Sequence, residues 1–208
     1  MSSAETRITE EEIKQILDLK GKARGQAIKN AIQAMIFLEG KEGFEKFLEE
    51  MKRIGYWLNE YEDHNNIKIF NWYPLWQDVL PIVVAARFFN WDEKKLEEFG
   101  RCNQRVSFFE RVLLKYFVSL KMVFQLTGER WSKHYNVGVL EPIKFDEINK
   151  QAIIRLKDFP AHSIFCTMLN GYFESATGYL TSSRNVNSVQ TECPNSGGKY
   201  HEYIISWK

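Results

Sequence analysis

The spacing of apolar residues changes once along this chain, and that change constrains the fold more than any other feature. Up to about residue 135, apolar residues recur at three- and four-residue intervals, the period of a helix with one buried face. Beyond it, segments 137–145 and 152–156 alternate or are β-branched, as strands are, around a polar turn at 147–150. Helical segments first and strands last predict an α+β protein.

The C-terminal part adds a helix and a hairpin to these two strands. Pro160 is expected to open a long helix, and segments 185–193 and 199–207 flank a turn at Pro194–Gly198. We therefore expect a four-stranded antiparallel sheet, made of two strands, a long helix that lies across one face, and a closing hairpin. An N-terminal helical bundle would complete the core.

Typical helix-end residues delimit the helices of that bundle. Thr9 can cap a short first helix, Gly40 is expected to stop the second, and Pro74 suits the first turn of a later one. Ser107 can cap a long helix whose wide aromatic stripe is typical of a central, buried helix. After the first helix, the predicted helices are 25–39, 43–54, 74–88, 92–103 and 107–127.

Composition bounds the function classes. The chain has 208 residues and a formal net charge of +1, so we expect one large domain over residues 11–208, a mobile arm over residues 1–10, and no nucleic-acid partner. Its three cysteines do not form a disulfide framework, and the N-terminus has no apolar signal core. The most apolar run, Val79–Phe89, is too short for a membrane span. A cytoplasmic protein with reduced thiols is expected.

Several short motifs occur in an order that resembles a known superfamily. They are Arg24-Gly25 at a helix start, Asn71–Pro74, Glu98–Arg101 before the aromatic helix, and Cys166 with Gly171-Tyr172, followed by Cys193 and Gly197. The chain resembles the superfamily of vinyl-4-reductase domains, haem nitric-oxide-binding domains and TRAPP subunits over residues 20–208. It looks closest to the vinyl-4-reductase branch and to related uncharacterised myxobacterial proteins.

This resemblance implies a small-molecule sensor or carrier that holds its ligand between the long helices and the sheet. Such domains often serve as the input module of a regulator. The resemblance therefore also implies a homodimer or a separate effector protein as the partner that receives the signal.

A zinc site is one implication of the resemblance. Relatives that sense aromatic compounds carry a Cys, a Glu and two further Cys near the C-terminal hairpin. Cys166 matches the first position, Gln190 falls where the Glu should be, Cys193 matches the third, and His201 replaces the last Cys. Cys and His are good zinc ligands, whereas Gln is a poor one. The alternative is a buried apolar Cys166 and a His201 on the hairpin surface.

The sequence argues against haem. The haem-binding branch needs an axial His on its central helix, and residues 107–127 contain none. His134 lies beyond that helix, and the Tyr-x-Ser-x-Arg motif of that branch is missing from the strands before the last helix. The similar stretch Tyr179–Arg184 follows the last helix, and its Arg is one place late.

An apolar or aromatic small molecule is the ligand that the aromatic residues favour, because binding cavities need apolar walls with a few polar groups. The alternative is that these rings only fill the core. The predicted ligand-binding residues are Trp72, Tyr73, Trp76, Asn103, Phe109, Tyr116, Phe117, Phe165, Tyr172 and Phe173.

Catalysis has little support. The chain contains no phosphate-binding loop, no dinucleotide-binding glycine motif and no His-Glu-x-x-His. Cys102 has no identifiable base to activate it. We therefore expect a binding protein rather than an enzyme, or else a protein–protein adaptor with a fully packed interior. Exposed Trp and Phe residues around 70–91 would favour the adaptor, and a cavity beside helix 107–127 would favour the sensor.

Overall fold

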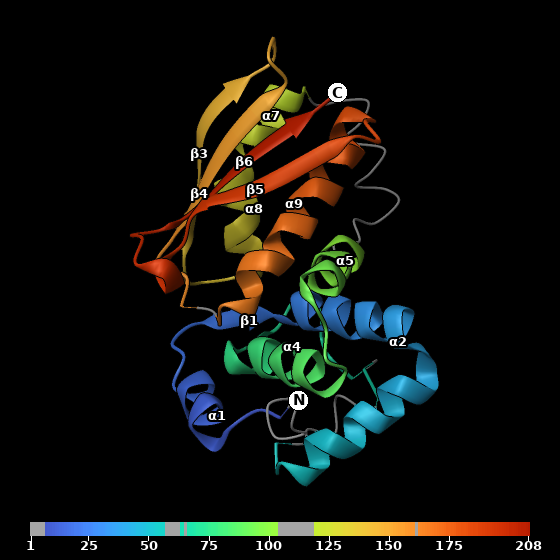
Figure 1. Cartoon of the computed structure of the whole chain (residues 1–208). Helices are drawn as coiled ribbons and strands as arrows, with labels where there is room; N and C mark the ends of the chain where they lie inside the picture. Colours follow the sequence, from blue (N-terminus) through green and yellow to red (C-terminus); the bar gives the residue numbers. More distant parts are fainter. Residues whose placement is uncertain (1–6, 57–62, 65, 104–118, 161) are drawn as a thin grey trace.

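The computed structural model is an α+β fold, as the sequence predicts, with a helical part at one end and a sheet at the other (Figure 1). It describes residues 7–56, 63–64, 66–103, 119–160 and 162–208. Residues 1–6 of the predicted N-terminal arm lie outside these ranges. Within them, no helix has both the length and the apolar character that crossing a bilayer requires.

Among the described residues, the helical part combines four helices with a small two-stranded sheet that the sequence did not predict. The predicted cap at Thr9 is present as a capping box, in which the Thr9 hydroxyl accepts from Glu12 N–H and the Glu12 carboxylate accepts from Thr9 N–H. Asp92 likewise caps its helix by accepting from Lys95 N–H. The elements are α1 (Glu10–Leu17), β1 (Lys22–Arg24), α2 (Gly25–Arg53), β2 (Trp72–Pro74), α4 (Trp76–Phe88) and α5 (Glu93–Asn103).

Two predicted boundaries change in this part. Gly40 does interrupt the helical path, with a φ of 72° that glycine adopts readily, but α2 continues at once in a new direction rather than after a loop (Figure 1). Pro74 does not open a helix. It pairs with Lys22 as the last residue of β2, and α4 begins two residues later.

The predicted long helix 107–127 is wrong where it can be compared with the structure. Most of it, residues 107–118, lies outside the described ranges. Ser119 has an extended backbone and caps a new short helix by accepting from Met122 N–H, so a single helix does not run through to Thr127. The described end of this segment forms α7 (Leu120–Gln125), and α8 (Thr127–His134) begins at its last residue.

The main sheet has the predicted four antiparallel strands, in the order β3-β4-β6-β5. One face is buried because alternate residues point inward, as in Ala152, Ile154 and Leu156 of β4. The predicted helix after Pro160 is present but begins at Ile164, and Figure 1 shows it crossing this face. The elements are β3 (Val139–Asp146), β4 (Gln151–Lys157), α9 (Ile164–Thr181), β5 (Val186–Glu192), the 3₁₀ turn η1 (Pro194–Ser196) and β6 (His201–Trp207).

Helices α5 and α9 join the two ends of the molecule through a very close crossing. A methyl group at Gly100 would overlap the carbonyl oxygen of Met168, and one at Gly171 would overlap the carbonyl oxygen of Glu97. Arg101 then reaches across to Glu174, at 2.6 Å between Nη1 and Oε2. The crossing therefore holds the helical part against the sheet layer, and one hydrophobic core runs through both.

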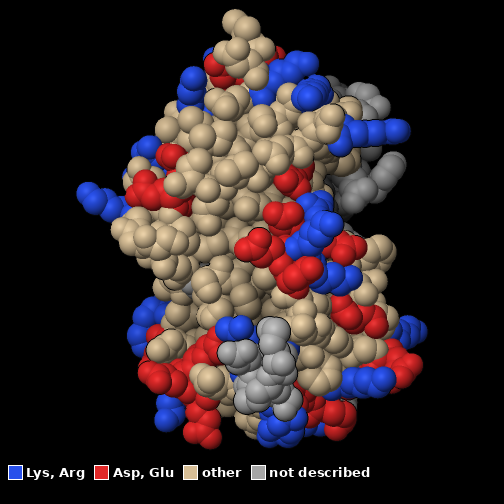
Figure 2. Space-filling view, in the orientation of Figure 1, with Lys and Arg blue, Asp and Glu red and all other residues tan. Residues whose placement is uncertain are grey.

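The outer face of the sheet is mostly uncharged, as Figure 2 shows over the region that the strands occupy in Figure 1. Ile153, Ile204 and Val189 form a row across three strands there, with Val189 48% exposed. Arg155 and Glu202 pair on neighbouring strands, at 2.6 Å between Nε and Oε2.

Candidate metal site

Three potential metal ligands meet where the start of α9 reaches the C-terminal hairpin. Cys166 lies in the first turn of α9, Cys193 follows the last residue of β5, and His201 is the first residue of β6. The thiols and one imidazole nitrogen lie within 4.8 Å of one another. The fold thus brings together all three residues that the sequence predicted as metal ligands.

A β-bulge gives Cys193 its direction. Gln190 is paired with Tyr203, but Glu192 is paired with Glu202, so β5 contains one residue more than β6 over this interval. In a regular strand, residues three apart point to opposite faces, and the extra residue cancels this alternation. Cys193 therefore lies on the inner side of the hairpin with His201, and its carbonyl accepts from Ser196 N–H and Gly198 N–H of the turn.

The distances suit a tetrahedral zinc ion after a small adjustment. Cys166 Sγ lies 3.1 Å from Cys193 Sγ and 3.5 Å from His201 Nδ1. Ordinary zinc–sulfur and zinc–nitrogen bonds place two sulfurs about 3.8 Å apart and sulfur about 3.5 Å from nitrogen. The two sulfur atoms would have to move apart by about 0.7 Å on this comparison.

His201 presents its Nδ1 lone pair to the thiols. Its ring also forms a hydrogen bond with the Phe159 backbone, and because Nδ1 faces Cys166, we assign that bond to the Nε2–H and the Phe159 carbonyl. Burial lowers the pKa of His201, which keeps the ring neutral at pH 7, as metal binding requires. The side chain is only 4% exposed, so the alternative of a surface histidine is wrong.

The Cys166 thiol is protonated in the metal-free protein. Burial, followed by the hydrogen bond with Cys193, raises the pKa of Cys166 to about 11. Zinc binds thiolates, so binding would release protons from these thiols.

Amide and hydroxyl groups complete the surroundings of the three ligands. The Gln190 amide donates to His201 Nδ1 and to the Tyr203 hydroxyl, at 3.2 Å in each case. The Asn195 amide donates to Cys166 Sγ at 3.5 Å. Tyr203 is fully buried, and its hydroxyl lies 3.4 Å from the Cys166 carbonyl.

The predicted ligand-binding residues do not form one cavity in the described part of the chain. Phe165 and Phe173 are buried core residues of α9, and Phe173 packs against Tyr203 with 5.0 Å between ring centroids. Trp72 instead packs under the Arg24 guanidinium, 3.9 Å from the ring centroid, at the small sheet. Tyr73 and Trp76 pack at the edge of the core, and Tyr172 packs beside Phe173. Asn103 is the last residue of α5. The other predicted residues, Phe109, Tyr116 and Phe117, lie outside the described ranges.

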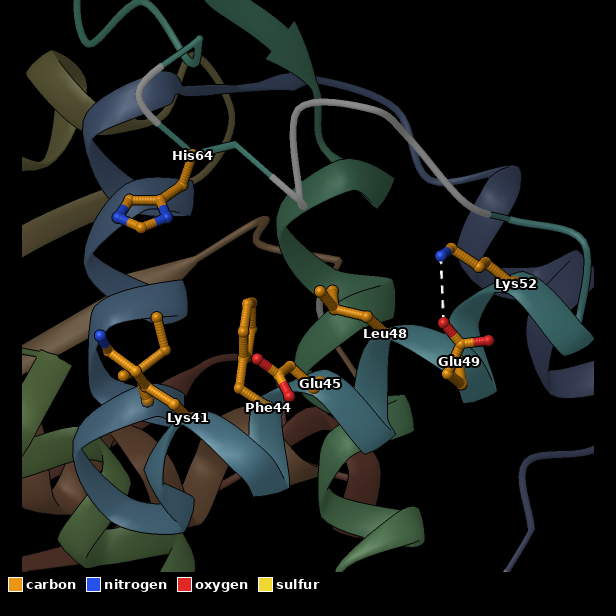
Figure 3. Close-up of a pocket in the computed structure, with 8 residues that line it drawn as sticks. Lys41, Phe44, Glu45, Leu48, Glu49, Lys52 and His64 are labelled. Atoms are coloured by element: carbon orange, nitrogen blue, oxygen red, sulfur yellow. Dashed lines mark hydrogen bonds and ion pairs between the residues drawn. The ribbon is translucent and has the colours of Figure 1, made fainter.

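The clearest pocket among the described residues lies elsewhere, on the helical part. It has a volume of about 380 Å³ and is open to the surface (Figure 3). His64 comes from the loop before β2, and the other lining residues come from α2 on both sides of its bend. Glu49 and Lys52 pair at 3.0 Å, and none of the predicted ligand-binding residues lines this pocket.

A buried polar group that the sequence analysis missed joins α4 to α8 and α9. The Tyr135 hydroxyl donates to Asp78 Oδ2 at 3.0 Å, and Asp78 is only 2% exposed. Burial raises the pKa of Asp78 to about 6. Burial also raises the pKa of the Tyr172 hydroxyl, and the positive charge of Arg130 partly opposes that rise. Nε of Arg130 is buried without a hydrogen-bond partner among the described residues. The only sequence signal was an aspartate within an otherwise apolar helix.

This arrangement of helices, sheet and crossing helix is the fold of H-NOX domains, which bind haem and nitric oxide. The chain matches an H-NOX protein from S. oneidensis in the Fe(II)NO state, with 12% identity, 88% of this chain and 98% of that one covered, and a TM-score of 0.62. It also matches an oxygen-binding H-NOX domain related to soluble guanylate cyclases, with 11% identity, coverage of 89% and 95%, and a TM-score of 0.62. The sequence matches no known protein family and no curated protein.

These structures overturn the expectation against haem. A third match, with 10% identity, coverage of 88% and 99%, and a TM-score of 0.60, comes from a study of haem redox potential and porphyrin distortion. In the matched structures this fold holds haem, so the expectation that haem is unlikely, which rested on a missing histidine, is wrong. The matched structures belong to the haem nitric-oxide-binding part of the superfamily that the sequence resembles, and at this identity they show the fold alone.

Aromatic rings are packed against one another between α8 and α9 in the described part of the chain. Trp131, Tyr135 and Phe159 contact one another there at 4.7 to 5.2 Å between ring centroids, and Phe159 also contacts Phe165. The matched structures are described by the haem, nitric oxide or oxygen that they carry.

Proposed function

We propose that this protein is a small-molecule-binding sensor or carrier domain in which a zinc ion ties the C-terminal hairpin to α9. The observation that carries the zinc proposal is the convergence of Cys166, Cys193 and His201 within 4.8 Å, with His201 in the tautomer that leaves Nδ1 free for a metal. The binding role is supported by the fold, since the similar solved structures hold haem and gases.

The ligand of this sensor is, in our proposal, an apolar or aromatic molecule held between the long helices and the sheet. The zinc ligand pattern supports a place near the vinyl-4-reductase branch, because that branch carries metal ligands at the positions of Cys166 and Cys193. We further propose a cytoplasmic location, where the two thiols stay reduced, and a homodimer or a separate effector as the partner.

A protein–protein adaptor is the second candidate, and one observation favours it. Phe70 is 80% exposed and Phe88 is 40% exposed, in the segment where surface aromatics would indicate a docking surface.

Native mass spectrometry of the purified protein, followed by denaturation of the same sample, tests these proposals together. An added mass of one zinc that is absent from Cys193→Ser would support the metal site. An added mass of a few hundred daltons, lost on unfolding, would support the sensor, and the visible absorption spectrum would tell haem from another organic ligand. A bare chain mass in a stable dimer would favour the adaptor.

A further inference from the structure

The fourth corner of the metal site is occupied by a residue that is a poor zinc ligand. Gln190 Nε2 lies 3.2 Å from His201 Nδ1 and 3.2 Å from the Tyr203 hydroxyl, and the same amide hydrogen bonds with the Cys166 thiol. Among the described residues, the cluster of candidate metal ligands contains no carboxylate. The nearby Glu192 accepts from Lys199 N–H, and Glu202 is paired with Arg155.

Gln190 can change its role when a metal binds. In the metal-free protein its N–H group donates to the Nδ1 lone pair of His201. A metal ion would take that lone pair, and the N–H group would then face a cation. Turning the amide by half a rotation exchanges nitrogen for oxygen at almost the same position, because the two ends of an amide have nearly the same shape. The oxygen could then accept from the Tyr203 hydroxyl and coordinate the metal.

The net charge of the site favours this arrangement. Two thiolates balance the two positive charges of zinc, so a neutral fourth ligand gives an uncharged centre. A small thiol that replaces the amide would release its proton to solvent and give the centre one negative charge. An amide oxygen is nevertheless a much weaker zinc ligand than a thiolate, so a stronger donor should displace it.

The geometry points to Gln190 as a neutral, displaceable fourth ligand of the zinc ion, which leaves one position of the metal open to small thiols. Cys193 and its turn lie at the surface, where Asn195, Ser196 and Gly197 are exposed, so a thiol can approach from this side. This inference rests on the proposed zinc site and adds to it an exchangeable position and a ligand class.

Cobalt(II) is the probe for this inference, because its visible spectrum reports both the number of thiolates and the identity of the remaining ligands. The full-length protein would be loaded with cobalt and titrated with a small thiol, alongside Gln190→Ala and Gln190→Glu. Gln125→Ala, an exposed glutamine on α7, is the matched control.

We expect a graded result. Gln190→Ala should bind zinc about ten- to a hundredfold more weakly and change the cobalt spectrum. It should also bind the added thiol at lower concentration than the wild type does. Gln190→Glu should hold the metal more tightly and resist the thiol, and Gln125→Ala should behave as the wild type.

The outcomes distinguish a missing metal site from a wrong role for Gln190. If neither zinc nor cobalt binds the wild type, the metal site itself is absent. If the wild type binds the metal through both thiols, but all Gln190 variants give its spectrum and thiol response, Gln190 is not a ligand and the inference is overturned. A weaker affinity without a spectral change would also overturn it, because that is the effect of a residue that only orients His201.

Discussion

At the scale of single residues, the buried Asp78 carboxyl is the least expected feature of the core. It lies in the first turn of α4 and accepts a hydrogen bond from the Tyr135 hydroxyl, 57 residues later in the chain. Sequence reasoning identifies the apolar stripe of α4, but it cannot identify a partner contributed by the end of α8. A carboxyl group held this way contributes to folding in a pH-dependent manner.

The free energy of unfolding should therefore fall as the pH rises through about 6. Burial raises the pKa of Asp78 from 3.8 to about 6, so the folded state binds this proton more tightly than the unfolded state does. That stabilisation is complete below about pH 4 and is lost above the folded pKa, a difference of about 3 kcal/mol. Asp78→Asn should remove the dependence, since an amide oxygen can still accept from Tyr135.

Urea unfolding of both proteins at about pH 4.5 and about pH 8 measures this difference. The Asp78→Asn substitution should stabilise the protein relative to the wild type at the higher pH, with the gap closing at the lower one. If Asp78→Asn lowers the free energy of unfolding equally at both pH values, the ionised Asp78 carboxylate does not destabilise the folded protein.

At the scale of elements, contacts within one segment were predictable and contacts between segments were not. The strands, the hairpin and the glycine-induced bend at Gly40 follow from local spacing and from glycine's freedom at positive φ. The small sheet of β1 and β2 escaped prediction because two three-residue strands, about fifty residues apart, carry no alternation. The crossing of α5 and α9 also escaped prediction, because it depends on the lack of a side chain at Gly100 and at Gly171.

Gly171→Ala should be strongly destabilising, although alanine is the better helix former. The added methyl group would overlap the Glu97 carbonyl oxygen in the facing helix, and a backbone atom cannot move aside as a side chain can. Overpacking of this kind costs about 1–3 kcal/mol or more. That corresponds to a loss of about 2–4 °C in Tm for each kcal/mol in a chain of this size.

Gly178→Ala in the same helix is the matched control. Its methyl group would lie 3.1 Å from the Ser183 carbonyl oxygen, tight but without overlap. Thermal unfolding should show a much smaller loss, or a gain from the helix propensity of alanine. Equal losses for both variants would mean that glycine at the crossing is not required.

At the scale of the whole molecule, the sequence placed the candidate metal site but could not establish its geometry. The resemblance to zinc-binding relatives pointed to Cys166, Cys193 and His201, whereas the burial of His201 and the directions of the side chains depend on how α9 lies against the hairpin. The aromatic residues gave the opposite result. They were predicted to line one ligand-binding cavity, but the described ones are divided among α9, α4 and the small sheet.

Removing zinc should loosen the hairpin and lower the stability of the whole domain. A ligand that binds only the folded state stabilises it by about 3–4 kcal/mol when present at about 100 to 1,000 times its Kd. Adding a chelator should therefore lower the Tm of the wild type and speed hydrogen exchange in β5, β6 and the first turn of α9.

Two variants separate this effect from a general loss of thiols. Cys193→Ser should have the same Tm with and without chelator, whereas Cys102→Ser, on α5 and outside the cluster, should respond as the wild type does. A chelator that leaves the wild-type Tm and exchange unchanged would contradict a stabilising zinc.

The bulge between Gln190 and Glu192 makes the metal site depend on chain length as well as on residue type. A relative that kept Gln190, Cys193 and His201 but lacked one residue in this interval would pair regularly and turn its cysteine toward solvent. Sequence comparisons that score only residue identities would predict that such a chain binds the metal. A one-residue insertion or deletion in the C-terminal hairpin would therefore create or abolish metal binding in related sequences without changing any ligand residue.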